Sequence, residues 1–262
     1  SEVYQKKIQN NELDISNLIT GVMDIMTNPT ELDNEFKVIN TKLFELEQNG
    51  RRYMGIEDLK IIETKTDGIK FIGTGYHQDN TLGLVYGDYD ITKNKLYDIE
   101  CKQFFKKTNC EKNWSMFINP KNNNEIHIIY CWYPLIIGML KDNNNIKELI
   151  PFEKKETPKI FRYVRGSSNG FIYKDEIWFL THIVSHGSPR YYYHMIVVFD
   201  SNINLLRYTP PFKLDNTPVE FTLSIVVEDD KVIIPYSKWD RETIIGIYNK
   251  QYIEKLFLNN NS

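Results

Sequence analysis

The chain has 262 residues and carries 32 Lys and Arg against 35 Asp and Glu, a formal net charge of −3. This balance provides no basic surface for nucleic acid or for an anionic membrane. The chain contains no alanine, 33 isoleucines and 26 asparagines, a bias that favours strands and turns over helices. An A/T-rich coding sequence produces the same bias, so composition by itself only disfavours an all-helical fold.

The sequence has neither an apolar run of 18 residues nor a signal-peptide pattern at its start. Its cysteines, Cys101, Cys110 and Cys131, lack the spacing of a zinc site or of a disulfide framework, as is typical of a reducing compartment. We therefore expect a cytoplasmic protein with no membrane partner, no nucleic-acid partner and no metal.

In the N-terminal part, 1–35 is irregular, with a strand expected at Val3 to Ile8 and a short helix around Ile15 to Met26. The segment from Phe36 to Glu47 is typical of one or two strands. This is too little for a regular four-stranded unit. Either an irregular segment completes the fold here, or the natural protein starts further upstream.

From about residue 56 onward, short apolar runs alternate with turns rich in Asn and Asp, which is typical of strands joined as hairpins. The strands predicted in this way are 69–76, 81–89, 95–101, 125–132, 135–140, 176–184, 191–199, 222–227, 231–236 and 243–248. Long amphipathic helices are absent from this pattern, so we expect an all-β protein.

The strands fall into sets that each open with a polar segment followed by an apolar one. These openings lie near residues 57, 111, 166 and 220, at intervals of 54, 55 and 54 residues. Units of this length with room for four short strands are typical of β-propeller blades. We predict a single-domain, five-bladed β-propeller over 1–262, with an irregular or incomplete N-terminal blade. A pair of β-sandwiches is the structural alternative.

In a propeller, the residues that open the innermost strands meet at one mouth of the central channel. The residues expected to meet there are Glu57, Asp58, Lys60, Glu111, Lys112, Arg165, His182, Glu220 and Asp240. Such a mixture of acids and cations suits chemistry on glycosides or phosphate esters. Asp58 lies between the apolar residues Ile56 and Leu59, so partial burial would raise its pKa. Alternatively, these acids only cap strand starts.

A run of aromatic residues gives a second candidate surface. Along this predicted strand, Arg190, Tyr192 and His194 share one face because side chains alternate. Aromatic rings beside an Arg suit a sugar platform, although Tyr is also a good strand former. No phosphate-binding loop, dinucleotide fingerprint or nucleophile-elbow motif is present in the sequence.

The motifs at these openings resemble those of a known family. Gly55 to Lys60 resembles the G-x-E-D-P-R segment of five-bladed propeller enzymes that act on mannosides, the inverting mannoside phosphorylases and the related β-1,2-mannosyltransferases. Lys112-Asn113 is similar to the K-N pair of that family, and Ile177 to His182 to its apolar strand ending in His. Val219 to Phe221 and Tyr236 to Asp240 are similar to its Y-E and Y-x-x-x-D segments. The resemblance covers about 36–248.

The same arrangement resembles propeller modules found beside glycosyltransferases, including modules in giant viruses. That likeness implies an adjoining glycosyltransferase module or an upstream segment as a partner, and the host cytoplasm as the location of a viral protein. The family resemblance implies Asp58 as proton donor to the glycosidic oxygen. It also implies that Lys112 and His182 hold phosphate or acceptor, and that Asp240 binds sugar hydroxyls.

The other residues predicted to bind substrate are Glu57, Lys60, Glu111, Asn113, Arg165, Arg190, Tyr192, His194 and Glu220. Two departures from the family pattern stand out. Lys60 and Leu59 replace its Arg and Pro, which removes bidentate anion binding at that point. The Asn-containing first-blade segment of the family has no counterpart in 1–35.

We therefore expect a carbohydrate-active propeller that binds a carbohydrate ligand and catalyses phosphorolysis or glycosyl transfer. No cofactor is expected; phosphate, a sugar phosphate or a nucleotide sugar would act as co-substrate. One alternative is a propeller that binds a glycan or a protein without catalysis. A further alternative is a hydrolase of the arabinofuranosidase type, with Asp58, Glu111 and Glu220 as its three carboxylates.

Overall fold

The computed structural model describes 56–79, 81–108, 110–121 and 125–258, together with the backbone of four short strands nearer the N-terminus. The helix expected around Ile15 to Met26 lies outside the described residues. Within the described part, no helix has the length and apolar character to cross a membrane.

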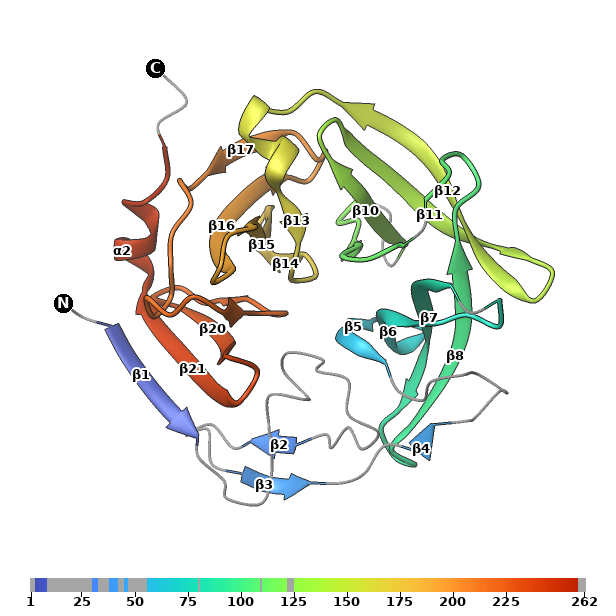
Figure 1. The fold of residues 1–262 in the computed structure, drawn as a ribbon, viewed down its shortest axis with the longest axis horizontal. Coiled ribbons are helices and arrows are strands. Elements are labelled where there is room, and N and C mark those ends of the chain that lie inside the picture. Colours follow the sequence, from blue (N-terminus) through green and yellow to red (C-terminus); the bar gives the residue numbers. More distant parts are fainter. Residues whose placement is uncertain are drawn as a thin grey trace.

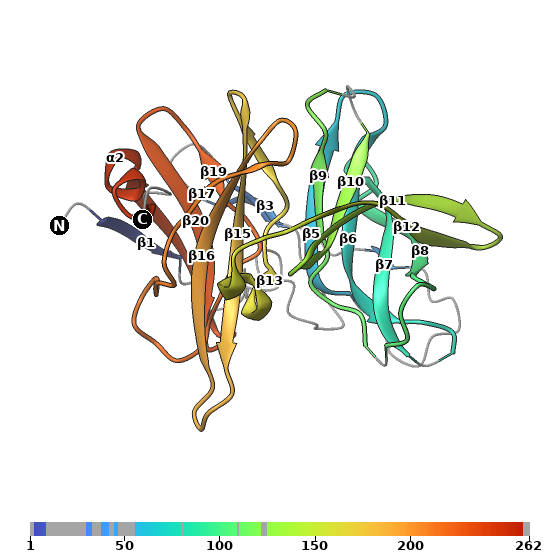
Figure 2. The same cartoon turned by 90° about the horizontal axis from the view of Figure 1, so that it is seen from above.

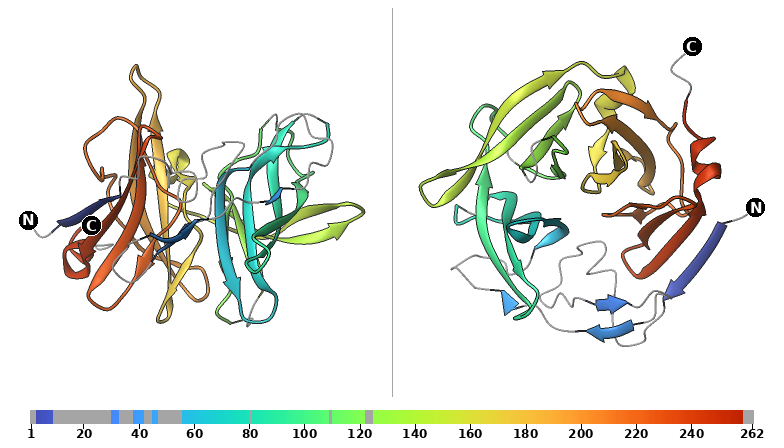
Figure 3. Two further views of the ribbon diagram at one scale, coloured as in Figure 1. Left: turned by 90° about the horizontal axis from the view of Figure 1, so that it is seen from below. Right: turned by 180° about the vertical axis from the view of Figure 1, so that it is seen from behind.

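The strands are arranged as a ring of sheets around a central axis, so the predicted β-propeller is confirmed (Figure 1). The described residues from 56 to 258 form four blades, and short strands nearer the N-terminus lie in the remaining part of the circle (Figure 1). In the views from above and below, most strands of the blades run roughly along the axis (Figures 2 and 3). The alternative of two packed sandwiches is wrong.

The first two blades are antiparallel sheets of four consecutive strands each. Blade 1 comprises β5 (Glu57–Thr64), β6 (Gly68–Tyr76), β7 (Leu82–Asp90) and β8 (Lys95–Lys102). Blade 2 comprises β9 (Ser115–Ile118), β10 (Ile126–Trp132), β11 (Leu135–Asn143) and β12 (Ile146–Lys155). A short parallel pairing of β12 with β8 joins the two blades.

In the next two blades the innermost strand is divided into two short pieces. Blade 3 comprises β13 (Arg165–Gly166) and β14 (Phe171–Tyr173), both paired with β15 (Glu176–Ser185), followed by β16 (Tyr191–Asp200) and β17 (Leu205–Tyr208). Blade 4 comprises β18 (Glu220–Phe221) and β19 (Val226–Val227), both paired with β20 (Lys231–Lys238), then β21 (Glu242–Asn249).

The N-terminal strands complete the circle in an unexpected way. The strand predicted at Val3–Ile8 is present as β1, but it pairs with β21 as the outer strand of blade 4 rather than building a fifth blade. β2 (Thr30–Leu32) and β3 (Val38–Thr41) form a separate two-stranded sheet between blades 4 and 1 (Figure 1). β4 (Glu45–Leu46) pairs in parallel with β8.

Among the described residues, two short helices lie outside the sheets. The 3-10 helix η1 (Lys159–Tyr163) lies in the connection between blades 2 and 3. The helix α2 (Lys250–Glu254) follows β21, and Asn249 caps it by accepting hydrogen bonds from two backbone N–H groups of its first turn.

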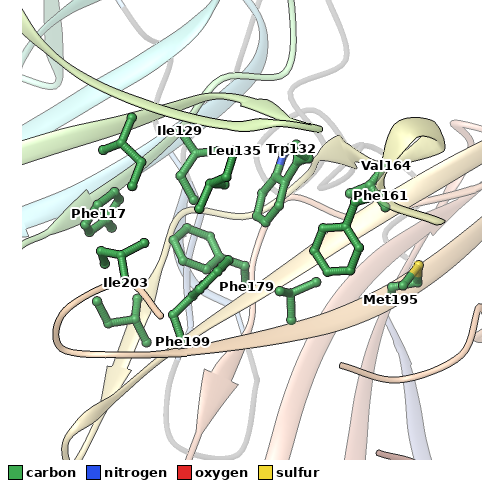
Figure 4. Packing of buried hydrophobic residues seen from close by; sticks show 13 residues of the cluster. Phe117, Ile129, Trp132, Leu135, Phe161, Val164, Phe179, Met195, Phe199 and Ile203 are labelled. Carbon is green, nitrogen blue, oxygen red and sulfur yellow. The ribbon is translucent and has the colours of Figure 1, made fainter. Parts of the chain in front are cut away.

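The hydrophobic core lies between neighbouring blades, and β15 shows why. Its continuous apolar run buries Phe179 in a cluster shared with blade 2, where the Phe179 and Trp132 rings meet edge to face at 5.5 Å (Figure 4). The alternate residues Trp178 and Leu180 lie in a second cluster shared with blade 4. A strand with both faces buried needs apolar residues at every position, because successive side chains point to opposite faces.

Candidate functional site

Asp58 lies in a β-bulge at the start of the innermost strand of blade 1. The pairing of β5 with β6 shifts register between Glu57 and Lys60, and the backbone of Asp58 adopts the left-handed conformation with φ of 53°. Gly73 lies opposite this bulge, where a Cβ atom would lie 2.2 Å from Ile56 Cγ2. The bulge therefore depends on a glycine in the neighbouring strand, and it sets the direction of the Asp58 side chain.

Charged side chains from three blades surround Asp58. Lys60, Lys112, Glu57 and Asp240 all lie close enough to influence the ionisation of its carboxyl group. Lys112 Nζ lies 3.2 Å from Glu57 Oε2, which joins blade 2 to blade 1 across the channel mouth. The structure therefore brings together five of the residues predicted from the repeat spacing.

The environment of Asp58 favours its protonated form. Burial raises the pKa of this carboxyl to about 7, although the neighbouring cations Lys60 and Lys112 oppose that rise. Burial also lowers the pKa of Lys60 to about 8, against the attraction of Asp58. A carboxyl group that keeps its proton near neutral pH can act as a general acid.

Lys60 takes a different position from the one expected. Its side chain is buried, and its ammonium group donates a hydrogen bond to the carbonyl oxygen of Trp114 in blade 2. This contact ties the two innermost strands together. The arrangement does not support the prediction that Lys60 binds substrate directly, since the ammonium group already has a protein acceptor.

His182 lies in blade 3, close enough to Lys60 for that ammonium group to influence its ionisation. The ring is buried, its Nδ1 lies 2.7 Å from Ser167 Oγ, and it pairs across the sheet with Arg165. Burial, and then the electrostatic influence of His194, Arg165 and Lys60, hold the pKa of His182 well below its usual value. The imidazole is therefore neutral at physiological pH and can exchange hydrogen bonds without carrying charge.

Two aromatic rings pack against His182. The Tyr192 ring centroid lies 5.9 Å from that of His182, and the Phe221 ring meets the same imidazole edge to face at 5.2 Å. Tyr192 is therefore next to the predicted site. Arg190 is exposed and precedes β16, whose hairpin with β15 extends beyond the body of the ring (Figure 2).

Asn113 shapes the mouth through its backbone. It adopts the left-handed conformation with φ of 63°, between Lys112 and the buried Trp114. A Cβ atom at Gly166 would lie 2.4 Å from the Asn113 carbonyl oxygen, so blades 2 and 3 approach closely at this point. Asp240 also has positive φ, 51°, in the turn between β20 and β21.

Glu111 does not join the cluster around Asp58. Its carboxylate accepts hydrogen bonds from Gln103 Nε2 at 2.9 Å and from Trp114 Nε1 at 3.0 Å, and another from Thr108 Oγ1 at 2.5 Å. These bonds organise the connection from blade 1 to blade 2, so the predicted contact of Glu111 with substrate is not supported.

Glu220 and His194 are wholly buried. Glu220 Oε2 accepts a 2.5 Å hydrogen bond from the Leu214 N–H and lies 3.8 Å from His194 Nε2. Burial lowers the pKa of His194 to about 3 and raises that of Glu220. Neither side chain reaches the mouth, so their predicted role in substrate binding is not supported. The three carboxylates proposed for an arabinofuranosidase-type site, Asp58, Glu111 and Glu220, do not converge.

A cavity of about 490 Å³ continues the channel beyond Lys60. Its walls come from the four innermost strands and from the adjoining loops, and they include Leu59, Ile118, Phe171 and Ile225. This lining is mainly apolar, whereas the titratable groups gather at the Asp58 end. We therefore place the chemistry at the charged mouth. Among the described residues no cluster of His, Cys, Asp and Glu has the arrangement of a metal site.

Sequence reasoning missed two residues that organise this mouth. Ser167, which lies at the repeat opening near residue 166, contacts His182. Phe221 packs against the same ring, directly after Glu220 in a segment already marked by the repeat. The repeat located both positions, but only the packing shows that their side chains meet His182.

Several solved structures share this fold. A hypothetical protein from Leishmania major matches with a TM-score of 0.50 and 10% identity, over 74% of this chain and 67% of that one. A β-1,2-mannobiose phosphorylase from Listeria innocua, solved with β-1,2-mannobiose, matches with a TM-score of 0.54 and 15% identity, over 84% and 65%. A mannose phosphorylase from Leishmania mexicana, solved with phosphate, matches with a TM-score of 0.51 and 8% identity. This match covers 79% of this chain and 72% of that one.

The likeness is one of fold. At these identities it shows a propeller architecture shared with carbohydrate-active enzymes. The chain spans about two thirds of the length of the structures it matches. No family model and no curated protein sequence matches it.

Proposed function

We propose that this protein cleaves or forms a glycosidic bond at the charged channel mouth, by phosphorolysis or by the reverse transfer of a glycosyl group from a sugar phosphate. The observation that carries the proposal is the buried carboxyl of Asp58, whose pKa is raised to about 7, beside Lys112 from the neighbouring blade. Phosphorolysis needs this pairing: an acid for the leaving oxygen and positive charge for the attacking anion.

The cations at the mouth suit an anion better than a water nucleophile. Lys112 is held at its place by Glu57, and Arg165 lies beside His182 on the facing blade. An inverting hydrolase instead needs a second carboxylate that takes a proton from water. Glu57 is bonded to Lys112, which reduces its value as a free base.

In the forward direction, Asp58 gives its proton to the glycosidic oxygen as the bond from that oxygen to the anomeric carbon breaks. A phosphate oxygen forms the new bond to the same carbon from the opposite face, which yields a sugar 1-phosphate of inverted configuration. Asp58 is left ionised and recovers its proton from solvent. In the reverse direction, ionised Asp58 takes the proton of the acceptor hydroxyl while the sugar phosphate loses phosphate.

The substrate class is proposed from two independent likenesses. The segments around Asp58, Lys112 and Asp240 resemble those of propeller enzymes that act on mannosides. Two of the solved structures with this fold are phosphorylases of mannose or mannobiose by their names. We therefore propose a mannoside as the glycosyl donor and phosphate as the co-substrate.

The test is to incubate the protein with β-1,2-mannobiose and phosphate and to measure mannose 1-phosphate, then to run the reverse reaction and measure released phosphate. Asp58→Asn should lower turnover at least a hundredfold because it removes the transferable proton. Asp88→Asn, a change of the same kind at an exposed carboxylate of blade 1, is the matched control and should keep wild-type turnover. Absence of turnover in wild type in both directions would overturn the proposal for this substrate.

A second candidate is a propeller that binds a glycan without catalysis. The position of Lys60 favours it, because its ammonium group is committed to the Trp114 carbonyl instead of facing an anion. Calorimetry with mannobiose separates the two candidates. Sugar binding that Asp58→Asn leaves intact, in a protein without turnover, would favour the binding-only function.

A further inference from the structure

A second cavity, of about 340 Å³, lies outside the channel on blade 1. It is bounded by residues between β6 and β7, by the end of β8 and by residues from 103–108 and 110–111, which precede blade 2. These last residues precede Lys112 in the chain, and the lining of the cavity shares no residue with the cluster around Asp58. Its size suits one small ligand.

The walls of this cavity are held in place by their own hydrogen bonds. Gln103 bonds the Lys106 backbone and the Glu111 carboxylate, and the Glu111 N–H donates to the Leu82 carbonyl oxygen at 3.2 Å. On the other side, Asp79 accepts from the Thr81 N–H at 3.0 Å and from Lys102 Nζ at 2.9 Å. A cavity with walls fixed in this way is formed before any ligand arrives, which reduces the entropic cost of binding.

The charged residues of the cavity lining whose side chains have no partner among the described residues are positive. Both acidic residues of the lining are already engaged, Asp79 by Lys102 and Glu111 by Gln103. The ammonium groups of Lys106 and Lys107 are exposed, and no described residue makes a side-chain hydrogen bond or ion pair with them. Two adjacent lysines in the lining of one cavity favour an anion with several oxygens, such as a phosphate.

The cavity lining also contains an exposed aromatic ring. Phe104 lines the cavity and is 61% exposed, the highest exposure of any large apolar side chain among the described residues. Its neighbour Phe105 differs, because it packs edge to face on Tyr130 at 5.0 Å. An exposed ring beside paired cations offers a stacking surface for the flat face of a base or a sugar.

We propose that this cavity binds a phosphate ester that carries a ring, with the phosphate on Lys106 and Lys107 and the ring on Phe104. A nucleoside diphosphate and a sugar phosphate share this chemistry. The site goes beyond the proposed glycosyl chemistry, because it lies outside the channel and its binding does not require Asp58 to be active.

Cys110 provides a local reporter of occupancy. This thiol is exposed and lines the cavity, whereas Cys131 is on blade 2 outside it and Cys101 is buried. We would follow alkylation of each cysteine by mass spectrometry with guanosine diphosphate, uridine diphosphate, mannose 1-phosphate or inorganic phosphate present. We expect at least a threefold slowing at Cys110 by one of the ring-bearing esters and no change at Cys131.

Variants separate the parts of the site. Lys106→Gln combined with Lys107→Gln should raise the Kd for the bound ester at least tenfold by calorimetry. Lys174→Gln combined with Lys231→Gln makes the same change in net charge on blades 3 and 4 and should leave the Kd within twofold. Phe104→Ala should weaken the ring-bearing ligand about fivefold and leave inorganic phosphate unchanged.

The outcomes distinguish this site from the channel. Binding and Cys110 protection retained in Asp58→Asn, in which turnover should fall at least a hundredfold, would support a separate site. The proposal is overturned if none of the four ligands protects Cys110 at millimolar concentration, or if the double Lys variant keeps the wild-type Kd. Protection by guanosine or uridine diphosphate alone would identify a nucleotide site, and protection by mannose 1-phosphate alone a sugar-phosphate site.

Discussion

The buried carboxyl of Asp58 makes the stability of the protein depend on pH. In the unfolded chain this group ionises near its usual pKa of 3.8, whereas burial in the folded protein raises the pKa to about 7. Between these values the folded state binds more protons than the unfolded state. The free energy of unfolding contributed by this group therefore falls as pH rises from about 4 to 7, and above pH 7 the full cost of a buried charge remains.

Asp58→Asn removes that cost, because the amide cannot ionise. The change in pKa corresponds to about 4 kcal/mol above pH 7. Loss of the attraction to Lys60 opposes this gain, since that attraction supports the charged form of the buried ammonium group. We therefore expect the variant to be about 1 to 3 kcal/mol more stable than wild type at pH 8, and nearly equal to it at pH 4.

Urea unfolding of both proteins at pH 4 and pH 8 measures this difference. Asp79→Asn is the matched control. Hydrogen bonds from Thr81 and Lys102 hold the pKa of Asp79 well below its usual value, so that variant should lose stability at pH 8 instead of gaining it. An Asp58→Asn protein no more stable than wild type at pH 8, or one with the same gain at both pH values, would refute an ionisation effect.

Two further predictions concern packing. Gly73→Ala should destabilise the fold by about 1 to 3 kcal/mol and lower turnover, because the added methyl group collides with Ile56 next to the Asp58 bulge. Thermal unfolding checks this, with Gly187→Ala, at a more open position, as the control. An unchanged melting temperature of Gly73→Ala would contradict the prediction. Phe179→Ala should lower the free energy of unfolding by about 3 to 5 kcal/mol, because it leaves a cavity in the hydrophobic cluster shared by blades 2 and 3. Phe104→Ala, at an exposed ring, should stay within about 0.5 kcal/mol in the same urea titration, and similar losses for the two Phe variants would contradict the assignment.

The alternation of apolar runs with turns, and the regular spacing of the repeat openings, made most of the strands predictable. The strand expected at 176–184 is observed as Glu176–Ser185, because its apolar run has to be buried on both faces. The strand Ile146–Lys155 was not predicted, since Pro151 and a charged run interrupt its pattern. The structure accommodates Pro151 through a register shift against β11, a tertiary solution that the local sequence does not show.

The candidate site was predictable where it depends on blade geometry and not where it depends on loops. Asp58, Lys112 and Asp240 come together because they occupy corresponding ends of different blades. Glu220 occupies a corresponding place too, but a loop folds back so that the Leu214 N–H reaches its carboxylate. Spacing along the chain places a backbone position, whereas the direction of a side chain depends on contacts far away in the sequence.

The pairing of β1 with β21 has a consequence for how the protein is made. Within each of the first three blades, the paired strands lie close together along the chain, so such a sheet can form soon after its residues leave the ribosome. Blade 4 is different, because Val3 pairs with Tyr248 near the other end of the sequence. Its outer strand is synthesised before the other strands of that blade and has no partner until the residues up to Tyr248 have been made, so its edge stays open to other partners in the meantime. Ring closure is therefore a late event in folding, and the time before closure is when a nascent chain is most exposed to aggregation or to chaperones.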